Sequence, residues 1–295
     1  MELRVLKYFL MVAREENVTR AAELLHITQP TLSRQLAQLE EEFNAKLFHR
    51  GGRRLTLTDE GMLLRRRAQE IVDLADKARQ ELSRGGALAG EVLIGCGETR
   101  NMTFLSRCIA RFRALHPSIR FSIHSAAADD IRERMERGLL DMGLLMEPVD
   151  VSRYAFLELP EKETWGALVR ADSPLAALSA VTAKDLADVP LILSGREAVR
   201  GELAHWFGDL YERLEIAATY NLLFNAANMV RCGVGVALTF HLDSDYPQTA
   251  FVPLTPRLEN GAVLAWKKEQ PVSAAARRFI AFLKACSKGM EEYPQ

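Results

Sequence analysis

The stretch TRAAELLHITQPTLSRQLAQLE, residues 19–40, is typical of two short helices separated by a tight break. On the second helix Leu32, Leu36 and Leu39 recur at helical spacing and predict a buried face. The other face is polar and comprises Gln29, Thr31, Ser33, Arg34 and Gln38. A helix that only packed into a core would not need so many hydroxyl, amide and guanidinium groups near its start. A helix-turn-helix places this part of its second helix in the DNA major groove, where Arg and Gln hydrogen-bond to base edges.

The flanking residues extend this pattern to a small domain. A preceding amphipathic helix is predicted from Leu3, Leu6, Phe9, Leu10 and Ala13. Thr19 and Thr28 are the predicted N-caps of the second and third helices. In LFHRGGRRLTLT, residues 47–58, the Gly51-Gly52 pair lies between two short alternating runs and predicts a β-hairpin. The arginines of this hairpin would form a wing that reaches DNA phosphates or the minor groove.

The segment TRAAELLHITQPTLSRQLAQLEEEFNAKLFHRGGRRLTLTDEG, residues 19–61, resembles the winged helix-turn-helix of LysR-type transcriptional regulators. The matching elements are the AA pair, the TQPTLSRQ stretch, the LE run, LFxR and LTxxG, in this order and spacing. The resemblance implies four contacts in the major groove and one on the wing. These residues are Gln29, Pro30, Ser33, Arg34 and, on the wing, Arg53. We add Thr31 and Arg50 on their chemistry, and expect residues 1–58 to bind double-stranded DNA.

A long helix is predicted over residues 59–84, with Thr58 as its cap. Its apolar residues step by four and three, as in a coiled-coil heptad. They are Leu64, Ala68, Ile71, Ala75, Ala78 and Leu82. A partner helix should cover this seam; the alternative is that the helix lies on its own domain. In the LysR-type family this segment is the linker helix that pairs two subunits, which implies a homodimer or homotetramer on a pseudo-palindromic DNA site.

Glycines in SRGGALAG, residues 83–90, end this helix, and we place a hinge at residues 85–90. Strand and helix patterns then alternate through residues 91–146, which predicts a parallel α/β sheet with helices on both faces. Further predicted strands cover residues 165–170, 190–194, 216–221, 233–239 and 262–266, and a last helix covers residues 273–288.

The resemblance implies that residues 91–295 form a two-lobed α/β effector domain similar to periplasmic binding proteins. The expected bounds are 91–161 and 268–295 for lobe I and 162–267 for lobe II, with crossings near Glu161–Glu163 and Trp266–Lys268. NMVRCGVGVAL, residues 228–238, resembles the helix–GxG–strand signature of the family's second lobe. A small-molecule effector is expected between the lobes, beyond the carboxyl ends of the strands.

The candidate effector-binding residues lie at these strand ends or open the next helix. They are Thr99, Arg100, Asn101, Ser125, Met146, Ser194, Arg196 and Asn225. Free N–H groups at a helix start, together with Arg100 and Arg196, suit a carboxylate. Thr99 also matches a family position that often contacts the effector. Glu98 and Glu147 favour an amine instead, or simply pair with the arginines.

The composition limits the alternatives. The 295 residues include 38 Lys and Arg against 39 Asp and Glu, so a DNA contact must come from a local basic patch. There is no signal-peptide pattern and no apolar run long enough to span a bilayer, so we expect a cytoplasmic protein that does not contact membranes. The four cysteines are widely spaced and the histidines lack ligand spacing, so neither a metal nor a cofactor is expected.

No motif in the chain points to catalysis, since HExxH, GxSxG, P-loop and complete GxGxxG patterns are missing. We therefore expect a transcriptional regulator, not an enzyme, whose effector shifts its DNA-binding heads and changes RNA polymerase recruitment. One alternative is a thiol-based redox sensor of the same family that uses Cys96 and Cys108, although apolar neighbours favour inert thiols. An alternative of a different class is a small-molecule binding protein or an enzyme, which would not need residues 1–60.

Overall fold

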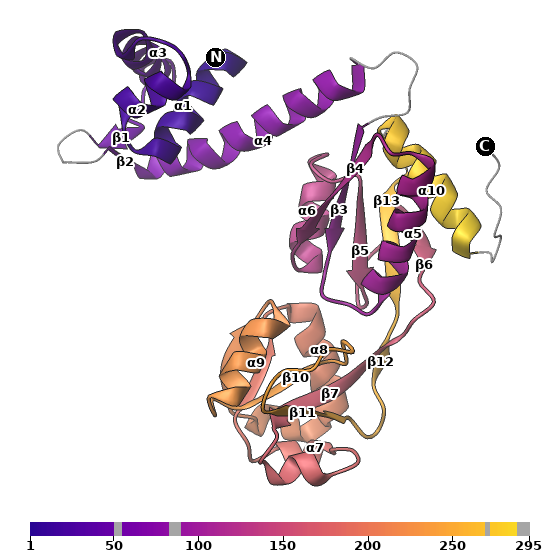
Figure 1. Ribbon diagram of the computed structural model, residues 1–295. Helices are drawn as coiled ribbons and strands as arrows, with labels where there is room; N and C mark the ends of the chain where they lie inside the picture. The colour runs from indigo at the N-terminus through magenta and orange to yellow at the C-terminus, as the bar shows by residue number, and fades with distance from the viewer. Residues whose placement is uncertain (50–54, 83–89, 269–271, 288–295) are drawn as a thin grey trace. The chain divides into compact units, whose positions relative to one another are not determined.

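The computed structural model describes residues 1–49, 55–82, 90–268 and 272–287. The chain forms two compact units, Met1–Gly85 and Gly86–Gln295 (Figure 1). The described apolar residues of the first unit form one core cluster, and those of the second form separate clusters in its two lobes. The first unit contains the predicted DNA-binding head together with the long helix. Across the described ranges, no helix combines the length and the apolar character that a membrane span requires.

Three helices form the core of the first unit, as the apolar spacing predicts. They are α1 (Leu3–Glu15), α2 (Val18–Leu24) and α3 (Gln29–Glu42). The predicted inner face of α3 is buried, because Leu32, Leu36 and Leu39 are at most 4% exposed. These leucines pack in one cluster with Phe9 of α1, which fixes the polar face of α3 toward the outside of the unit.

The observed N-cap of α3 agrees with the sequence prediction, whereas that of α2 differs from it. Thr28 caps α3 as predicted, because its side chain accepts the backbone N–H of Thr31. The predicted cap of α2 is wrong. Asn17 takes that place and accepts the N–H of Arg20 at 3.0 Å, so that Thr19 lies within the first turn. Asn and Thr are both favoured caps, and only the backbone path distinguishes them here.

The predicted hairpin is present as β1 (Phe48–His49), which pairs antiparallel with β2 (Thr56–Leu57). Helix α4 (Asp59–Leu82) follows directly, and the Thr58 hydroxyl oxygen caps it by accepting the N–H of Gly61 at 2.9 Å. A Cβ atom at Gly61 would overlap the carbonyl oxygen of Leu47. The glycine of the LTxxG pattern therefore lets α4 pack closely against the strand that begins the wing.

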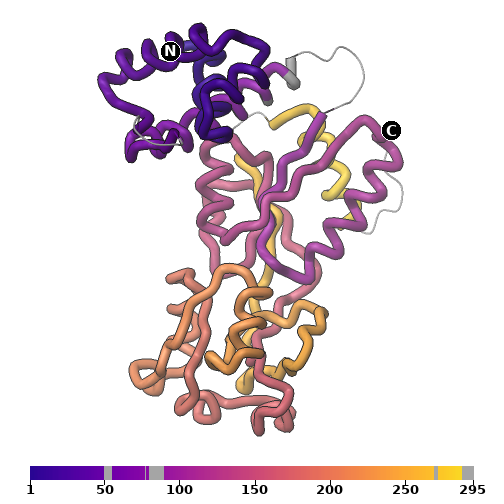
Figure 2. The backbone as a smooth tube through the Cα atoms, turned by 60° about the vertical axis from the view of Figure 1, so that its left-hand side comes forward, coloured from indigo at the N-terminus to yellow at the C-terminus, as the bar shows by residue number. Residues whose placement is uncertain are grey.

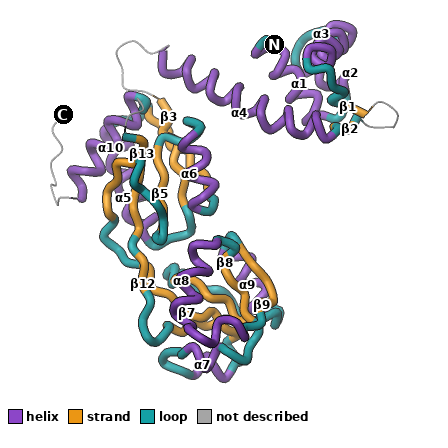
Figure 3. The backbone as a smooth tube through the Cα atoms, turned by 180° about the vertical axis from the view of Figure 1, so that it is seen from behind, coloured by secondary structure: helices purple, strands orange, loops and turns teal. Residues whose placement is uncertain are grey.

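Lobe I is built on one five-stranded sheet with the order β4-β3-β5-β13-β6. Its strands are β3 (Gly90–Cys96), β4 (Ile119–Ser125), β5 (Met142–Met146), β6 (Tyr154–Glu158) and β13 (Ala262–Lys267). Strands β4, β3 and β5 are parallel, as predicted from the alternating pattern. Helices α5 (Asn101–Leu115) and α10 (Ala274–Ser287) cover one face, and α6 (Ala128–Glu136) covers the other (Figure 3). The short strand β6 was not predicted.

Strand β13 corrects the predicted lobe boundary. It pairs antiparallel with β5 and β6, so the chain returns to lobe I between Asn260 and Ala262 and not near Trp266–Lys268. Leu264 and Trp266 pack with α5 and α10, whereas Val263 and Ala265 pack with α6. This strand is central in its sheet and buried on both faces, so its apolar run fits either lobe equally well. Its pairing with β5 and β6, which are distant in sequence, assigns β13 to lobe I.

Lobe II contains a six-stranded sheet with the order β11-β7-β10-β8-β9 and with β12 paired to β7. Its strands are β7 (Glu163–Arg170), β8 (Leu191–Ser194), β9 (Ile216–Tyr220), β10 (Val236–Phe240), β11 (Thr249–Pro253) and β12 (Glu259–Asn260). Helix α8 (Glu197–Phe207) covers one face and α9 (Leu223–Arg231) covers the other, while α7 (Ala183–Leu186) lies in a connection. Strand β11 was not predicted.

Two chain segments connect the lobes and lie side by side (Figure 2). At this crossing β7 and β12 pair antiparallel, with Glu163 opposite Asn260 and Thr164 opposite Glu259. Side chains at the carboxyl ends of the lobe I and lobe II strands therefore meet close to a short two-stranded connection.

Candidate functional site

The first candidate site is the N-terminal end of α3. Gln29, Pro30, Thr31 and Arg34 are exposed there, and Ser33 is half-buried. Gln29 Nε2 donates to Ser33 Oγ at 2.9 Å, and the hydroxyl groups of Thr28 and Thr31 lie 2.8 Å apart. These contacts orient short polar groups along one side of the helix, as groups that face a DNA groove require.

Arg34 differs from its polar neighbours on α3. Its side chain is exposed and, within the described part of the chain, makes no hydrogen bond or ion pair. A guanidinium group on a fixed helix with no internal partner is available for bidentate hydrogen bonds to a base. Arg50 and Arg53, the other predicted arginines, lie outside the described residues.

Glu40 supports this surface and was missed by the sequence reasoning. Its carboxylate is 3% exposed, accepts the backbone N–H of Leu47 at 2.9 Å and pairs with Lys46 at 3.2 Å. The buried carboxylate thus ties the end of α3 to the strand that begins the wing. The signal was the acidic residue of the LE run, which sits on the apolar side of the helix.

Helix α4 divides the predicted dimer seam into two parts. Leu64 and Ala68 pack into the head's own core, and Ala68 is fully buried, so the expectation that it faces a partner is corrected. Ile71 is 38% exposed, and Ala75 and Ala78 lie half-buried and exposed respectively. The side chain of Leu82 lies outside the described part.

Leucines outside the predicted seam continue the exposed part of it. Leu63 is 60% exposed and Leu74 is 39% exposed. At about 100° per residue, these two side chains and those of Ile71 and Ala78 fall within one quarter of the helix circumference. The exposed apolar stripe of α4 therefore consists of Leu63, Ile71, Leu74 and Ala78.

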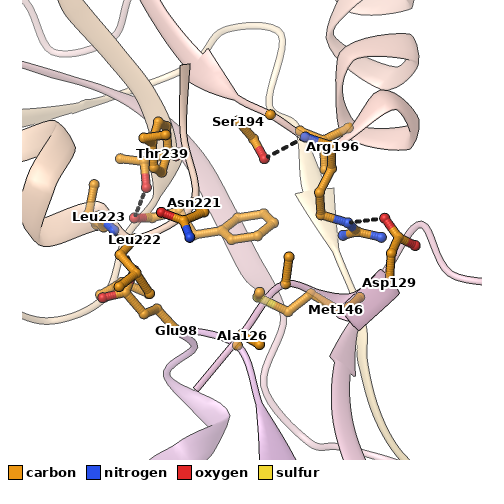
Figure 4. A pocket seen from close by; sticks show the side chains of 18 of the residues that line it. Glu98, Ala126, Asp129, Met146, Ser194, Arg196, Asn221, Leu222, Leu223 and Thr239 are labelled. Atoms are coloured by element: carbon orange, nitrogen blue, oxygen red, sulfur yellow. Dashed lines mark hydrogen bonds and ion pairs between the residues drawn. The ribbon is translucent and has the colours of Figure 1, made fainter. Parts of the chain in front are cut away.

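The second candidate site is a cavity of about 300 Å³ lined by residues of both lobes (Figure 4). Of the predicted effector-binding residues, the structure brings Met146, Ser194 and Arg196 to its wall. Apolar and aromatic groups supply much of the remaining wall. They include Trp165, Val199, Leu222, Leu223, Phe240 and Leu242. Such a cavity has the size and the mainly apolar lining of a small-molecule site.

The other predicted effector residues do not line this cavity. Thr99 and Asn101 are buried and both donate hydrogen bonds to Glu163 Oε1, so they join lobe I to the first crossing. Arg100 pairs with Asp243 at 2.6 Å and with Glu161 at 3.3 Å.

Ser125 and Asn225 are exposed and are also absent from the described lining. Thr99, Arg100 and Asn101, which were expected to bind an effector carboxylate, thus bind carboxylates of the protein itself.

Two side chains of the described lining, Glu98 and Arg196, join the lobes directly across the cavity. Glu98, which follows β3 in lobe I, accepts the backbone N–H of Leu223 at the start of α9. Arg196 of lobe II donates to Asp129 Oδ2 at 3.5 Å and to the Pro148 carbonyl oxygen at 3.1 Å. Sequence reasoning missed the role of Glu98, although its position after a strand was a signal.

Cys96 and Cys108, the pair that the redox alternative would use, are both free and buried, as the favoured interpretation of inert thiols expects. Cys96 is buried and its Sγ lies 2.9 Å from the Gly97 carbonyl oxygen, whereas Cys108 hydrogen-bonds to Cys286. Burial raises the pKa of both Cys96 and Cys108 to about 12, with the Glu163 charge adding to the effect at Cys96. Among the described residues no group of three or more His, Cys, Asp or Glu could hold a metal ion.

Comparisons with known proteins identify the family of both parts of the chain. Residues 3–62 match the bacterial regulatory helix-turn-helix protein family of lysR type, and residues 85–287 match the LysR substrate binding domain. The chain is 31% identical over 291 residues to the Hca operon transcriptional activator HcaR of Escherichia coli (strain K12), covering 96% of this chain and 97% of that protein. It is 32% identical over 241 residues to the transcriptional activator IlvY of Salmonella typhimurium (strain LT2), covering 81% and 82% of the two chains.

The fold is also similar to that of full-length CbnR in a crystal structure with its target DNA. The TM-score is 0.74 at 21% sequence identity, covering 96% of this chain and 99% of that one. The two family models match the head with the first residues of α4, and both lobes. The chain therefore belongs to the LysR family of DNA-binding transcriptional regulators.

Proposed function

We propose that this regulator acts in the cytoplasm as a homodimer or homotetramer and reads a two-fold-related DNA site through the start of α3. The observation that carries the proposal is Arg34, which is exposed and has no partner among the described residues, on a helix whose inner face is buried in the head. Arg34 would hydrogen-bond to a base edge, supported by Gln29, Thr31 and Ser33. Arg50 and Arg53 would contact the DNA from the wing.

The exposed apolar stripe of α4 would join two subunits. Pairing along this helix places two heads on one duplex, which matches a pseudo-palindromic site. The relatives HcaR and IlvY are described as transcriptional activators, and CbnR was crystallised with its target DNA, so activation through RNA polymerase recruitment is the mode we propose here.

A small molecule in the cavity between the lobes would control the regulator. It would act by binding unequally to two arrangements of the assembly, because a ligand shifts an equilibrium only by its differential affinity. The position of the cavity supports this role, since contacts such as Arg196 with Asp129 cross it and would change with the spacing of the lobes.

DNA selection in vitro tests the central claim. The preferred site of the wild-type protein would first be selected from random duplexes, and affinities for single-base variants would then be compared with those of Arg34→Ala. Losing a bidentate base contact should reduce discrimination at one position in each half-site by about 1–3 kcal/mol.

Arg14→Ala is the matched control, because Arg14 is an exposed arginine of α1 that pairs with Glu15. It should leave the sequence preference unchanged. Unaltered base discrimination in Arg34→Ala would show that α3 is not the reading element.

A further inference from the structure

The charges around the cavity between the lobes restrict what it can bind. Of the described lining residues, Glu98, Asp129 and Glu197 are acidic and Arg196 is basic. Glu98 and Arg196 lie on opposite sides of the cavity (Figure 4). The lining therefore carries an excess of negative charge, although the sequence favoured a carboxylate ligand.

The groups that would hold an anion are already engaged. Arg196 is 11% exposed and is bound by Asp129 and by the Pro148 carbonyl oxygen. The start of α9 presents backbone N–H groups and the positive end of a helix dipole. That position is taken by Glu98, whose Oε2 accepts the N–H of Leu223. A ligand carboxylate would have to displace one protein carboxylate and lie near the others.

Glu98 retains capacity to bind a cation. Its Oε2 is used by Leu223, while within the described part of the chain its Oε1 accepts no hydrogen bond. The charge of Glu98 is felt by two nearby phenols: burial raises the pKa of Tyr220 to about 12 and raises that of Tyr246, and Glu98 adds to both effects. A positive ligand group beside Glu98 would pair with the carboxylate oxygen that Leu223 does not use and would offset the charge that these phenols sense.

The rest of the wall suits the body of such a ligand. Met146, Trp165 and Phe240 line the cavity, and the ring centroids of Trp165 and Phe240 lie 4.4 Å apart in a tilted arrangement. Aromatic faces attract cations and also pack against apolar groups. A compact alkyl or aryl group attached to an ammonium would therefore satisfy both parts of the lining.

We propose that the effector of this regulator is a small organic cation, an alkyl- or arylalkyl-ammonium compound, whose charged group binds the Glu98 carboxylate while its apolar body packs among Met146, Trp165 and Phe240. The inference rests on the proposed effector role of the cavity and names the ligand class for it. It replaces the carboxylate expected from the sequence.

Matched pairs of probes test the sign of the ligand charge on the full-length protein. Benzylamine would be compared with benzoate, 2-phenylethylamine with phenylacetate, and pentylamine with pentanoate, using thermal shift and then calorimetric titration. We expect at least one amine to raise the melting temperature while its carboxylate partner does not. Glu98→Gln, which keeps an oxygen acceptor for Leu223, should weaken that amine by about tenfold or more, the loss expected for about 1.4 kcal/mol of ion pairing.

Glu212→Gln is the control for net charge, because Glu212 is exposed and does not line the cavity. It should bind the amine as the wild type does. Stronger stabilisation by a carboxylate than by its amine, no stabilisation by any amine, or undiminished amine binding in Glu98→Gln would overturn the proposal. If the protein bound carboxylates and still selected a DNA sequence, only the ligand class would be rejected. If the wild-type protein showed no DNA sequence preference, the proposed regulator function would be rejected whatever the probes showed.

Discussion

Asn101 of lobe I donates a hydrogen bond from Nδ2 to Glu163 Oε1, 2.9 Å away, where the chain first crosses between the lobes. The same Nδ2 donates to the Glu161 carbonyl oxygen at 2.8 Å, and Thr99 also donates to Glu163 Oε1. Glu163 is fully buried, and its Oε2 has no hydrogen-bond partner in the described part of the chain. The lobe connection thus depends on a buried carboxylate held by two side chains.

Removing one of these donors should destabilise the second unit. Asn101→Ala withdraws a hydrogen bond from a buried charged group, which costs about 1.5–3 kcal/mol. All three tryptophans, Trp165, Trp206 and Trp266, lie in this unit, so urea unfolding followed by tryptophan fluorescence reports it selectively. The midpoint should fall.

Ser122→Ala serves as the control for this measurement, because Ser122 is exposed on β4. If Asn101→Ala kept the wild-type midpoint yet abolished effector binding, the original assignment of Asn101 to the ligand site would be correct.

The exposed stripe of α4 gives a prediction about assembly. Leu74→Asp places a charge on the stripe without touching the head's own core, since Leu74 is 39% exposed. Burying the exposed part of two leucines contributes about 1–2 kcal/mol to a dimer, and two buried carboxylates would oppose it further, so its dissociation constant should rise by about tenfold or more. Sedimentation equilibrium would detect the shift toward monomer.

A second exposed leucine separates an interface effect from a general loss of apolar surface. Leu178 is 42% exposed in lobe II, and Leu178→Asp should leave the assembly unchanged. An undisturbed dimer in Leu74→Asp would mean that the subunits associate elsewhere.

Features of the fold that depend on local spacing could be predicted from the sequence. The buried face of α3, its Thr28 cap and the pairing of β1 with β2 follow from residues within a few positions of each other. Met146, Ser194 and Arg196 were found because strand ends in a parallel sheet gather at one edge.

Features that depend on distant partners could not be predicted. Thr99 and Asn101 resembled ligand residues until Glu163, more than sixty positions away, was seen to accept from them. Pairing with β5 and β6 assigns β13 to lobe I, and the apolar sequence of β13 alone does not indicate which lobe it joins. Ala68 likewise fits a dimer seam or a head core, and contact with the α1 core decides between them.

Thiol reactivity should distinguish the cysteines and test the redox alternative. With a pKa of about 12, Cys96 and Cys108 are thiolates at pH 8 to an extent roughly a thousandfold lower than an ordinary cysteine. Cys232 is exposed and should react with iodoacetamide first, while Cys96 and Cys108 should react only after unfolding. Mass spectrometry of tryptic peptides would give the order.

Cys232→Ser removes the fast site and should leave the slow ones unaffected. The same peptides measured after peroxide treatment address the alternative directly. A disulfide between Cys96 and Cys108 at low peroxide would favour a redox sensor over an effector-controlled regulator.

The carboxyl group of Glu202 gives a stability prediction with a defined pH dependence. Its Oε1 accepts a hydrogen bond from Asn260 Nδ2 at 2.7 Å, while Oε2 is buried without a partner among the described residues. Burial raises the pKa of Glu202, and the charge of Glu147 raises it further. The folded protein therefore holds this proton more tightly than the unfolded chain, and the contribution of Glu202 to stability falls as pH rises from the unfolded pKa through the folded one.

Glu202→Gln keeps the acceptor for Asn260 and removes the charge. The variant should be more stable than the wild type at pH 7, and this gain should shrink as pH falls toward the pKa of an ordinary glutamate, about 4.3, where the wild-type carboxyl is protonated in both states. Urea midpoints from tryptophan fluorescence between pH 4.5 and 8 measure the difference in stability from the wild type. For Glu212→Gln, at an exposed site, this difference should not change with pH. A variant less stable than wild type at pH 7 would mean that the ionised carboxylate stabilises the fold, through its attraction to Arg196 across the same cluster.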